Sequence, residues 1–189
     1  MSSLGAELPT GTGPIASAHA QEERFKKLGI DLLILRPGYF FENFYGSLGL
    51  IKNMAVNGGA IEPNVALPMI ATADIGTVAA EELLRASFRG VVIRELLGPR
   101  DLTLEEATTI FGKAIGEGNL PYVRFPDEDF RAGLLQMGFS KGVAEAFLEM
   151  SHAFNAGKIR SLEGRNKRNT TPTRFEDFAQ QLAAAYRAM

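Results

Sequence analysis

The first residues whose types and spacing could do chemistry are Gly11 and Gly13, in a segment GTGPIA that fits the pattern G-x-G-x-x-A. In dinucleotide-binding proteins this pattern forms a tight turn between a buried strand and a helix, whose N-terminus faces a pyrophosphate. Here only MSSLGAELPT precedes Gly11, and this polar segment, interrupted by Gly5 and Pro9, leaves no room for such a strand. The sequence therefore predicts a flexible glycine turn with Pro14 near the start of a helix, and not a cofactor cradle.

Several acidic side chains are also candidates for a metal site or a structural role. Asp127, Glu128 and Asp129 are adjacent, but they open a predicted helix, where carboxylates complement the helix dipole, and no histidine lies near in sequence. They therefore predict a helix start, and we expect no metal site. Asp74 has two interpretations, a helix cap or an anchor that orders a loop, and its residue type favours the cap.

Composition limits the function classes. Among 189 residues, 20 Lys and Arg against 22 Asp and Glu give a formal net charge of −2, so no concentrated basic face points to nucleic acid or to an anionic membrane. The segment EGRNKRNTTP at 163–172 is expected to form a polar, basic loop. Its residues 165–168 could attract a phosphate, although a solvated loop is the favoured interpretation for them. The absence of cysteine excludes disulfides, thiolate metal sites and thiol catalysis.

Hydrophobic patterning predicts an α/β layer followed by helices. Ile30 to Leu35 and Gly90 to Leu96 are short apolar runs, typical of parallel strands covered on both faces. Residues 14–27 and 75–87 suit helices. We expect a division into residues 1–100, with the strands, and residues 101–189, a small and mostly helical region.

Capping signals mark the helices of the second region. Thr103 and Glu106 have the spacing of a capping box, and so do Thr173 and Glu176. Ser140 is expected to cap another helix.

The order of several segments resembles the NmrA-like family of atypical short-chain dehydrogenases/reductases. The segments are SSLGA (2–6), a helix with an EE pair, GIDLLILRPGYFFENF (29–44), TADIGTVAAEELL (72–84), GPRDLTLEEA (98–107), and VRFPDEDF with MGFS (123–140). The resemblance covers essentially all of the chain, but only the later part of the family's domain. It implies a partial, Rossmann-like parallel sheet in which SSLGA closes the fifth strand. Residues 1–100 would be the C-terminal part of the NAD(P)-binding domain, and residues 101–189 would form the substrate-side region. By this resemblance, strands one to four and the glycine-rich phosphate turn, on the order of 100 residues, would precede Met1.

The resemblance also implies site residues. The backbone at Pro37 and Gly38 would face a nicotinamide, and Ser3 would lie at the same edge of the sheet. Tyr39, Phe40 and Asn43 would line the substrate pocket. The alternative is that Phe40, Phe41, Phe44 and Tyr45 form a core between two layers, and the sequence alone does not decide between an aromatic pocket and an aromatic core.

Catalytic residues are harder to find. Related reductases use a Tyr-x-x-x-Lys pair on the helix before the LRP strand, and these two positions fall on Pro14 and Ala18, neither of which transfers protons. His19, one residue further, is the remaining candidate proton donor. A lone helical histidine is usually a surface residue, so this candidate is weak.

Three functions stay open on this basis. The parent activity would be NAD(P)H-dependent reduction of a small carbonyl or quinone-like acceptor, with NADP or NAD as cofactor. The alternatives are a non-catalytic regulator that senses nicotinamide, or a truncated product without activity of its own. We further expect a cytoplasmic location, a small-molecule substrate, no nucleic-acid or membrane partner, and self-association through an exposed sheet edge.

Overall fold

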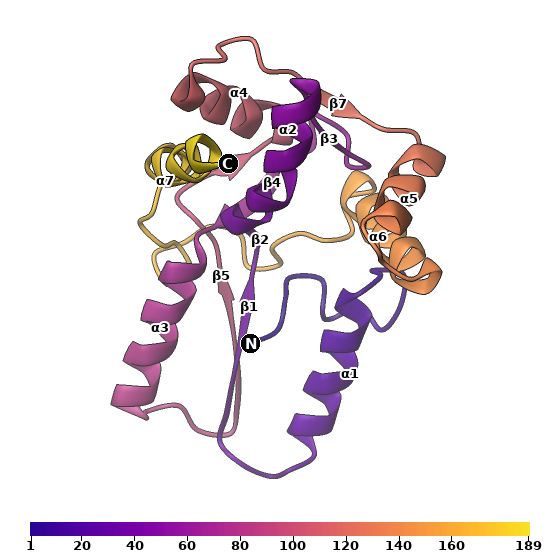
Figure 1. Ribbon diagram of the computed structural model, residues 1–189. Coiled ribbons are helices and arrows are strands. Elements are labelled where there is room, and N and C mark those ends of the chain that lie inside the picture. Colours follow the sequence, from indigo (N-terminus) through magenta and orange to yellow (C-terminus); the bar gives the residue numbers. More distant parts are fainter.

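The chain, described over residues 1–189 in a computed structural model, alternates short strands with helices (Figure 1). The elements are α1 (Ile15–Lys26), β1 (Leu32–Pro37), β2 (Tyr39–Phe40), the 3-10 helix η1 (Phe41–Ser47), α2 (Leu48–Met54), β3 (Asn57–Gly59), β4 (Leu67–Ile70), α3 (Thr72–Arg85), β5 (Val91–Leu96), β6 (Asp101–Leu102), α4 (Leu104–Ile115), β7 (Tyr122–Arg124), α5 (Asp127–Gln136), α6 (Lys141–Asn155) and α7 (Phe175–Ala188). The fold is α/β, as predicted, with its strands concentrated in the first half.

The central feature is a parallel pair of strands, β1 and β5, in register from Leu32 opposite Val91 to Pro37 opposite Leu96. The first predicted strand was placed two residues too early, because Ile30 is 53 % exposed and belongs to the turn after α1. Residues 2–4 lie along the other edge of β1. The Ser2 N–H donates to the Leu35 carbonyl at 2.7 Å, and the Leu4 N–H donates to the Pro37 carbonyl at 3.0 Å.

The opposite edge of the sheet receives residues 169–171. The Leu97 N–H donates to the Asn169 carbonyl at 2.7 Å, and the Thr171 N–H donates back to the Leu97 carbonyl at 2.8 Å. Asn169 and Thr171 are buried. The prediction of a solvated loop is confirmed for residues 165–168, which are exposed, whereas residues 169–171, at the end of the predicted polar segment, pair with the sheet.

Helices cover both faces of this sheet. On one face, Leu35 and Leu96 pack against Ile75 of α3 in a small separate core. On the other face, Arg36 contacts Glu22 of α1. Figure 1 shows α3 and α1 on opposite sides of β1 and β5. The α1 face is thus held by a buried ion pair where the α3 face is held by apolar packing.

The ion pair between Arg36 and Glu22 is nearly excluded from water, with side chains 7 % and 4 % exposed. Two parallel bonds join them, Nε to Oε1 at 2.8 Å and Nη2 to Oε2 at 2.6 Å. Ser2 donates to the same carboxylate at 2.5 Å, and Glu7 accepts from Arg36 at 3.2 Å. One cluster therefore joins the N-terminal segment, α1 and β1.

Two expected helix caps turned out differently. Asp74 does not cap α3, since its carboxylate accepts the N–H of Thr173 at 3.0 Å and the hydroxyl of the same residue at 2.6 Å. The favoured interpretation of Asp74 was thus wrong, and the alternative, an anchor for a loop, is what the structure has. The predicted box at α7 is absent as well, because Thr173 is used by Asp74 and Glu176 pairs with Arg100. The caps at Thr103 and Ser140 are confirmed.

The main hydrophobic core lies beyond the carboxyl end of β1, under α4, α7 and the strands β2, β4 and β6. Its centre is aromatic: the Phe41 and Phe175 rings meet edge to face at 5.1 Å, and Phe178 stands 5.6 Å from Phe41. This core draws residues from both sides of residue 100. The expected domain division at that point stays a prediction.

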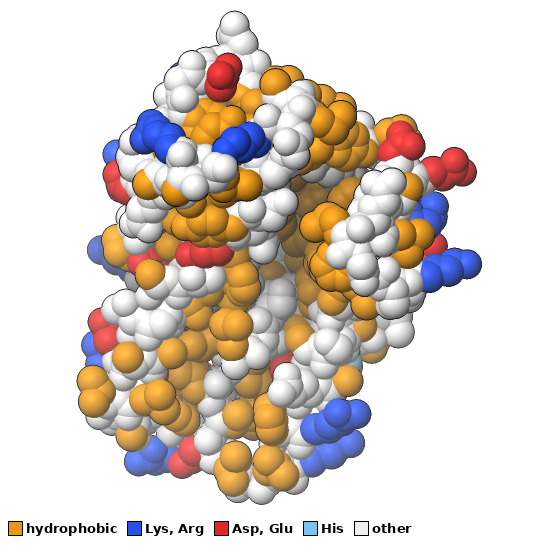
Figure 2. Space-filling model, in the orientation of Figure 1, with side chains coloured by type: hydrophobic (Ala, Val, Ile, Leu, Met, Phe, Trp, Pro, Cys, Tyr) orange, Lys and Arg blue, Asp and Glu red, His pale blue; other side chains and the backbone are white.

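Exposed apolar side chains gather at the lower end of the molecule as drawn, around α3 and the strands (Figure 2). Leu83 is 73 % exposed, Leu84 is 88 % exposed, and Val91 of the adjacent strand is 47 % exposed. None of the helices combines the length and the apolar character needed to span a bilayer.

The buried ion pair should dominate the stability of the α1 face. Glu22→Gln keeps the side-chain volume but leaves Arg36 without its main counter-charge, so we expect the free energy of unfolding, measured in urea, to fall by about 3 kcal/mol. Glu23→Gln, one residue along and about half exposed, is the control and should leave stability unchanged.

The same pair predicts a pH dependence. Burial raises the pKa of Glu22, but hydrogen bonds from Arg36 and Ser2 outweigh it and hold the pKa below its usual value of 4.5. A pKa lowered by folding stabilises the protein above pH of about 4.5, and this stabilisation is lost as the pH falls through the folded-state pKa. The difference between the wild type and Glu22→Gln should therefore shrink in acid. A difference that is constant from neutral to acidic pH would contradict this account.

The exposed apolar residues should drive self-association. We expect the chain to form dimers or larger species in light scattering after size-exclusion chromatography, because apolar surface of this kind is rarely left bare. Replacing Leu83 and Leu84 together by Glu should shift the mass toward a monomer, whereas Leu162→Glu, at a loop position that is also exposed (58 %), should not. A monomeric wild type at high concentration would refute this expectation.

Candidate functional site

A cavity opens where β1 ends, between the main core and the α5–α6 pair. It has a volume of about 790 Å³ and is lined by 33 residues, of which 19 are hydrophobic. Figure 2 shows it as a hollow with largely hydrophobic walls beside α5 and α6. Open α/β sheets bind ligands at this end of their strands.

Six residues expected from the sequence lie together in the wall of this cavity. They are Ser3, Pro37, Gly38, Tyr39, Phe40 and Asn43. Ser3 reaches the site because residues 2–4 pair with β1, and the other five follow directly from the end of β1 into β2 and η1. Their roles stay predictions, but the structure brings them to one place.

His19 is not part of this wall. Its Nδ1 lies 2.8 Å from the Ala6 carbonyl oxygen, so the ring ties α1 to the N-terminal segment. The weak prediction of a proton donor therefore finds no support in its position.

Gly38 stands at a point where two backbones nearly touch. A Cβ atom added there would lie 1.8 Å from the carbonyl oxygen of Pro68 in β4. The Gly38 N–H meanwhile donates to the Leu96 carbonyl at 3.0 Å. The glycine is thus required for β1 to pass into β2, which pairs with β4 through Tyr39 opposite Met69.

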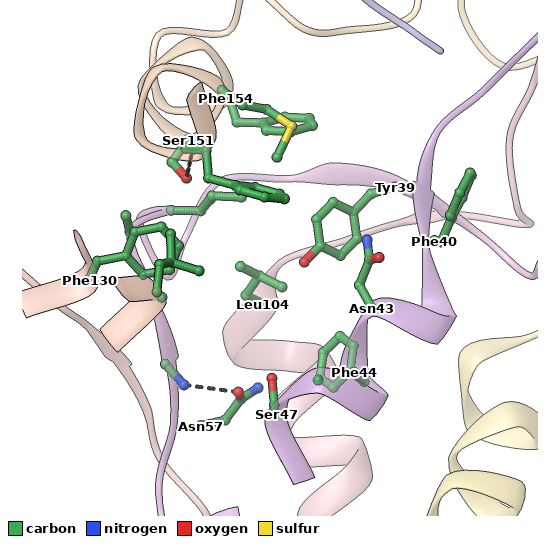
Figure 3. A pocket seen from close by; sticks show the side chains of 18 of the residues that line it. Tyr39, Phe40, Asn43, Phe44, Ser47, Asn57, Leu104, Phe130, Ser151 and Phe154 are labelled. Carbon is green, nitrogen blue, oxygen red and sulfur yellow. Dashed lines mark hydrogen bonds between the residues drawn. The ribbon is translucent and has the colours of Figure 1, made fainter. Parts of the chain in front are cut away.

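Tyr39 is the most prominent polar residue facing the cavity, and Figure 3 shows its hydroxyl directed inward beside the Asn43 amide. Burial raises the pKa of Tyr39 to about 12, with Asn43 offsetting part of the effect. Burial likewise raises the pKa of Tyr122, whose hydroxyl donates to the Ile61 carbonyl at 3.0 Å. Both phenols are therefore protonated donors at neutral pH, and Tyr122 has its donor in use.

The sequence left open whether the aromatic residues after Gly38 form a pocket or a core, and the structure gives a different answer for each of them. Phe41 is buried in the core against Phe175 and does not line the cavity. Phe44 does both, since it packs 4.9 Å from Phe175 and also forms part of the cavity wall. Tyr45 lies outside the cavity, 43 % exposed, against Phe178.

The far wall of the cavity was expected from the resemblance only as a substrate-side region, without named residues. It comes from α5, α6 and the turn between them and includes Phe130, Leu134, Phe139, Phe147 and Phe154. The Phe154 ring meets Tyr39 edge to face at 6.1 Å, so the two walls touch. The apolar spacing along α5 and α6 was the available signal, but such spacing is the same for a helix packed on a core.

A polar corner was also missed. The Asn57 side chain donates to the Thr108 hydroxyl at 2.8 Å. Its amide oxygen accepts the Gly58 N–H at 2.9 Å (Figure 3). Ser47 lies across from it in the wall. Asn57 is 2 % exposed, so it positions strand β3 rather than offering free groups to a ligand.

Comparison with known proteins decides the family. The model of the NmrA-like family matches residues 16–179. The chain belongs to the NmrA-like family. Curated relatives include Prestalk A differentiation protein A of Dictyostelium discoideum, 29 % identical over 168 residues, and agroclavine dehydrogenase of Claviceps fusiformis, 26 % identical over 157 residues. These alignments cover 85 % and 79 % of this chain but only 53 % of either relative, so the chain spans about half of their length.

Solved structures of the same fold include the NADPH-dependent quinone oxidoreductase QOR2 of Escherichia coli, solved in complex with NADPH. It superimposes with a TM-score of 0.79 at 23 % identity, over 96 % of this chain and 63 % of QOR2. The negative transcriptional regulator NmrA, in complex with NAD, gives a TM-score of 0.57 at 14 % identity, over 96 % of this chain and 58 % of NmrA. The Rossmann-like character of this NmrA-like chain is thereby shown.

The glycine turn at the start has a structural role in this member of the family. A Cβ on Gly13 would lie 1.9 Å from the Ala146 carbonyl oxygen, so the turn packs tightly on α6. The Gly13 N–H donates to the Glu149 carboxylate at 3.1 Å. No strand precedes the turn in residues 1–10, and an acidic side chain takes the N–H that a phosphate would need. Both features agree with the prediction that the G-x-G-x-x-A segment is a glycine turn and not a cradle for the cofactor phosphates.

The close contact at Gly38 should make this position intolerant of any side chain. We expect Gly38→Ala to lower the free energy of unfolding by about 3 kcal/mol, because the methyl group forces β2 away from β4. Gly49→Ala in α2 is the control, since nothing lies within 4 Å of a Cβ there and alanine favours the helix. If both variants unfold at the wild-type urea concentration, the two strands are not packed as described.

Proposed function

We propose that the protein to which these residues belong is an NAD(P)H-dependent reductase of a flat, largely apolar carbonyl or quinone-like acceptor, and that residues 1–189 supply the acceptor cavity. The observation that carries the proposal is the cavity itself. A largely hydrophobic chamber of about 790 Å³, with nine aromatic residues among the 33 that line it, opens at the carboxyl end of β1, where Pro37 and Gly38 form its floor. Its size is that of a small-molecule site, and its aromatic walls suit a conjugated ring system.

The floor of the cavity fits one end of a nicotinamide cofactor. Ser3, Pro37 and Gly38 would hold the nicotinamide ring, because residues 2–4 pair with the carboxyl end of β1 and all three residues line the acceptor space. The family relationship and the complexes of QOR2 with NADPH and of NmrA with NAD support a nicotinamide cofactor. The reduced nicotinamide supplies a hydride when bound. The turn at Gly11 and Gly13 does not fit the phosphates, since it packs against Glu149 and α6.

Tyr39 has the position to assist reduction of a neutral acceptor. A carbonyl or quinone oxygen gains negative charge as a hydride arrives, and a preorganised hydroxyl donor stabilises that charge. The Tyr39 hydroxyl faces the cavity next to Asn43, and its raised pKa keeps the proton on the phenol. In this proposal Tyr39 donates a hydrogen bond to the acceptor oxygen, Asn43 orients the phenol, and the α5–α6 wall excludes water.

A second candidate, a regulator that binds nicotinamide without turnover, is favoured by one observation. The positions of the Tyr-x-x-x-Lys pair of related reductases hold Pro14, exposed at the start of α1, and Ala18. Turnover separates the two candidates. We expect oxidation of NADPH or NADH, followed by absorbance, when a quinone such as menadione is added to the protein. Nicotinamide binding by calorimetry without quinone reduction would support the regulator, and neither binding nor reduction would reject both functions.

The role of Tyr39 gives a sharper test. Tyr39→Phe should lower kcat for menadione by about 100-fold, because the stabilising donor is lost while the ring and its packing against Phe154 remain. KM should change little, since the ring still forms the wall. Tyr45→Phe removes a hydroxyl from outside the cavity and should leave kcat unchanged. Equal kcat values for the wild type and Tyr39→Phe would remove Tyr39 from the mechanism.

A further inference from the structure

The far wall of the cavity is apolar over a long stretch of the chain. From Phe130 to Met150, every residue that lines the cavity is either apolar or glycine. Tyr39 and Asn43, which offer polar groups, lie on the other side of the cavity (Figure 3). An acceptor ring placed against Tyr39 therefore has beside it a wall that makes apolar contacts alone.

This apolar wall continues past the mouth of the cavity onto the outer surface. Met137 and Phe139, at the turn between α5 and α6, line the cavity and are also 67 % and 39 % exposed. Leu135 and Val143, close to them in sequence, are 43 % and 39 % exposed. Figure 2 shows hydrophobic side chains on the side of α5 and α6 that borders the hollow. An exposed apolar rim that is continuous with a pocket marks a site of apolar binding.

Gly133 leaves a gap in the part of α5 that faces the cavity. It lies three residues after Phe130 and four before Met137, which is the spacing of one helix face, and all three residues line the cavity. A Cβ atom added at Gly133 would have no neighbour within 4 Å, so packing does not require glycine there as it does at Gly38. Glycine is also a poor helix former. The missing side chain therefore adds room to the cavity and contributes nothing to the fold.

Gly46 has the same character on the side of η1. Asn43, three residues before it, and Leu50, four residues after it, line the cavity as Gly46 does. A Cβ atom at Gly46 would also have no neighbour within 4 Å. Gly49 in α2 and Gly142 in α6 are equally open helical glycines outside the cavity wall, so they provide matched controls.

We propose that the acceptor carries an aliphatic chain, which lies along the α5–α6 wall and leaves the cavity over Met137 and Phe139, and that Gly133 and Gly46 set the room for this chain. The inference rests on the proposed reductase function and names its substrate class, a reducible ring with a hydrocarbon chain. The cavity volume of about 790 Å³ agrees with this class. It lies toward the upper end of the range of roughly 300–1,000 Å³ for small-molecule sites, so a compact ring leaves part of it empty.

Binding tests the inference without turnover. The probes are menadione and two derivatives that carry a butyl or an octyl chain on the same ring, titrated into the 189-residue protein by calorimetry. Full burial of a chain would tighten binding roughly 4-fold for each methylene, and only part of the chain lies inside the cavity. We therefore expect the octyl derivative to bind at least about 100-fold more tightly than menadione, with the butyl derivative between them.

Variants at the glycines locate the chain. Gly133→Leu and Gly46→Leu fill its path and should reduce the ratio of octyl to menadione affinity to about 10 or less, because fewer methylenes are then buried. Gly133→Ala, which favours the helix, should reduce the ratio by a smaller factor. Gly142→Leu and Gly49→Leu are the controls and should leave the ratio unchanged. Adsorption of the octyl chain to the surface would not follow this pattern, since an added leucine would strengthen it.

Equal affinity for the three probes, no binding of any of them, or equal ratios in Gly133→Leu and Gly142→Leu would overturn the inference. The proposed function is tested separately, by nicotinamide-dependent turnover of menadione, which has no long chain. Turnover of menadione together with equal probe affinities would keep the reductase and reject the chain site. A clear dependence on chain length without any turnover would keep the chain site and reject the reductase.

Discussion

Arg36 and Glu22 form a buried, bidentate ion pair on which the placement of the site depends. Arg36 immediately precedes Pro37 and Gly38, so the residue that anchors α1 also fixes where β1 enters the cavity. The same carboxylate accepts the Ser2 hydroxyl and thereby holds the N-terminal segment, including Ser3, along the edge of β1. An apolar pair would give comparable burial but would not specify this one arrangement of three segments.

A second constraint is the close backbone packing beyond the strand ends. Gly38 lies against the Pro68 carbonyl, and Gly98 lies against the Met69 carbonyl in the same way. A Cβ atom at Gly98 would lie 2.2 Å from the Met69 carbonyl oxygen. The two glycines bring β1 and β5 directly onto β4. The aromatic residues that follow Gly38 are therefore delivered at a fixed distance from the sheet, with Phe41 in the core and Tyr39 at the cavity.

Elements that depend on local pattern were predictable. The apolar runs gave both strands of the central pair, and Thr103 with Glu106 gave a capping box that the structure contains. The same pattern at Thr173 and Glu176 failed because each side chain has a partner distant in sequence, Asp74 in one case and Arg100 in the other. A capping signal states which bonds are available locally, and tertiary partners compete for the same atoms.

The residues of the cavity likewise fall into a group that local sequence pattern predicts and a group that it does not. The wall on the sheet side, Pro37 to Asn43, is one continuous segment from β1 into η1. Locating the end of β1 in the sequence was therefore enough to predict these residues. The far wall lies about 90 residues further along the chain, and amphipathic helices have the same pattern whether they face a core or a cavity. Ser3 is the exception among the near residues, since only its pairing with β1 brings it to the site.

Contacts outside the cavity determine its shape as much as the residues that line it. On the outer surface, Asp127 accepts from Arg124 of β7 at 2.8 Å and lies 2.7 Å from His152 of α6, so one carboxylate joins β7, α5 and α6. Strand β7 in turn pairs with β3, next to Asn57. The far wall is therefore a separately anchored unit placed over a floor that belongs to the sheet. Substitutions on the inner faces of α5 and α6 should therefore change the lining of the cavity without disturbing the strands beneath, and functions on a shared fold differ through such changes in their sites.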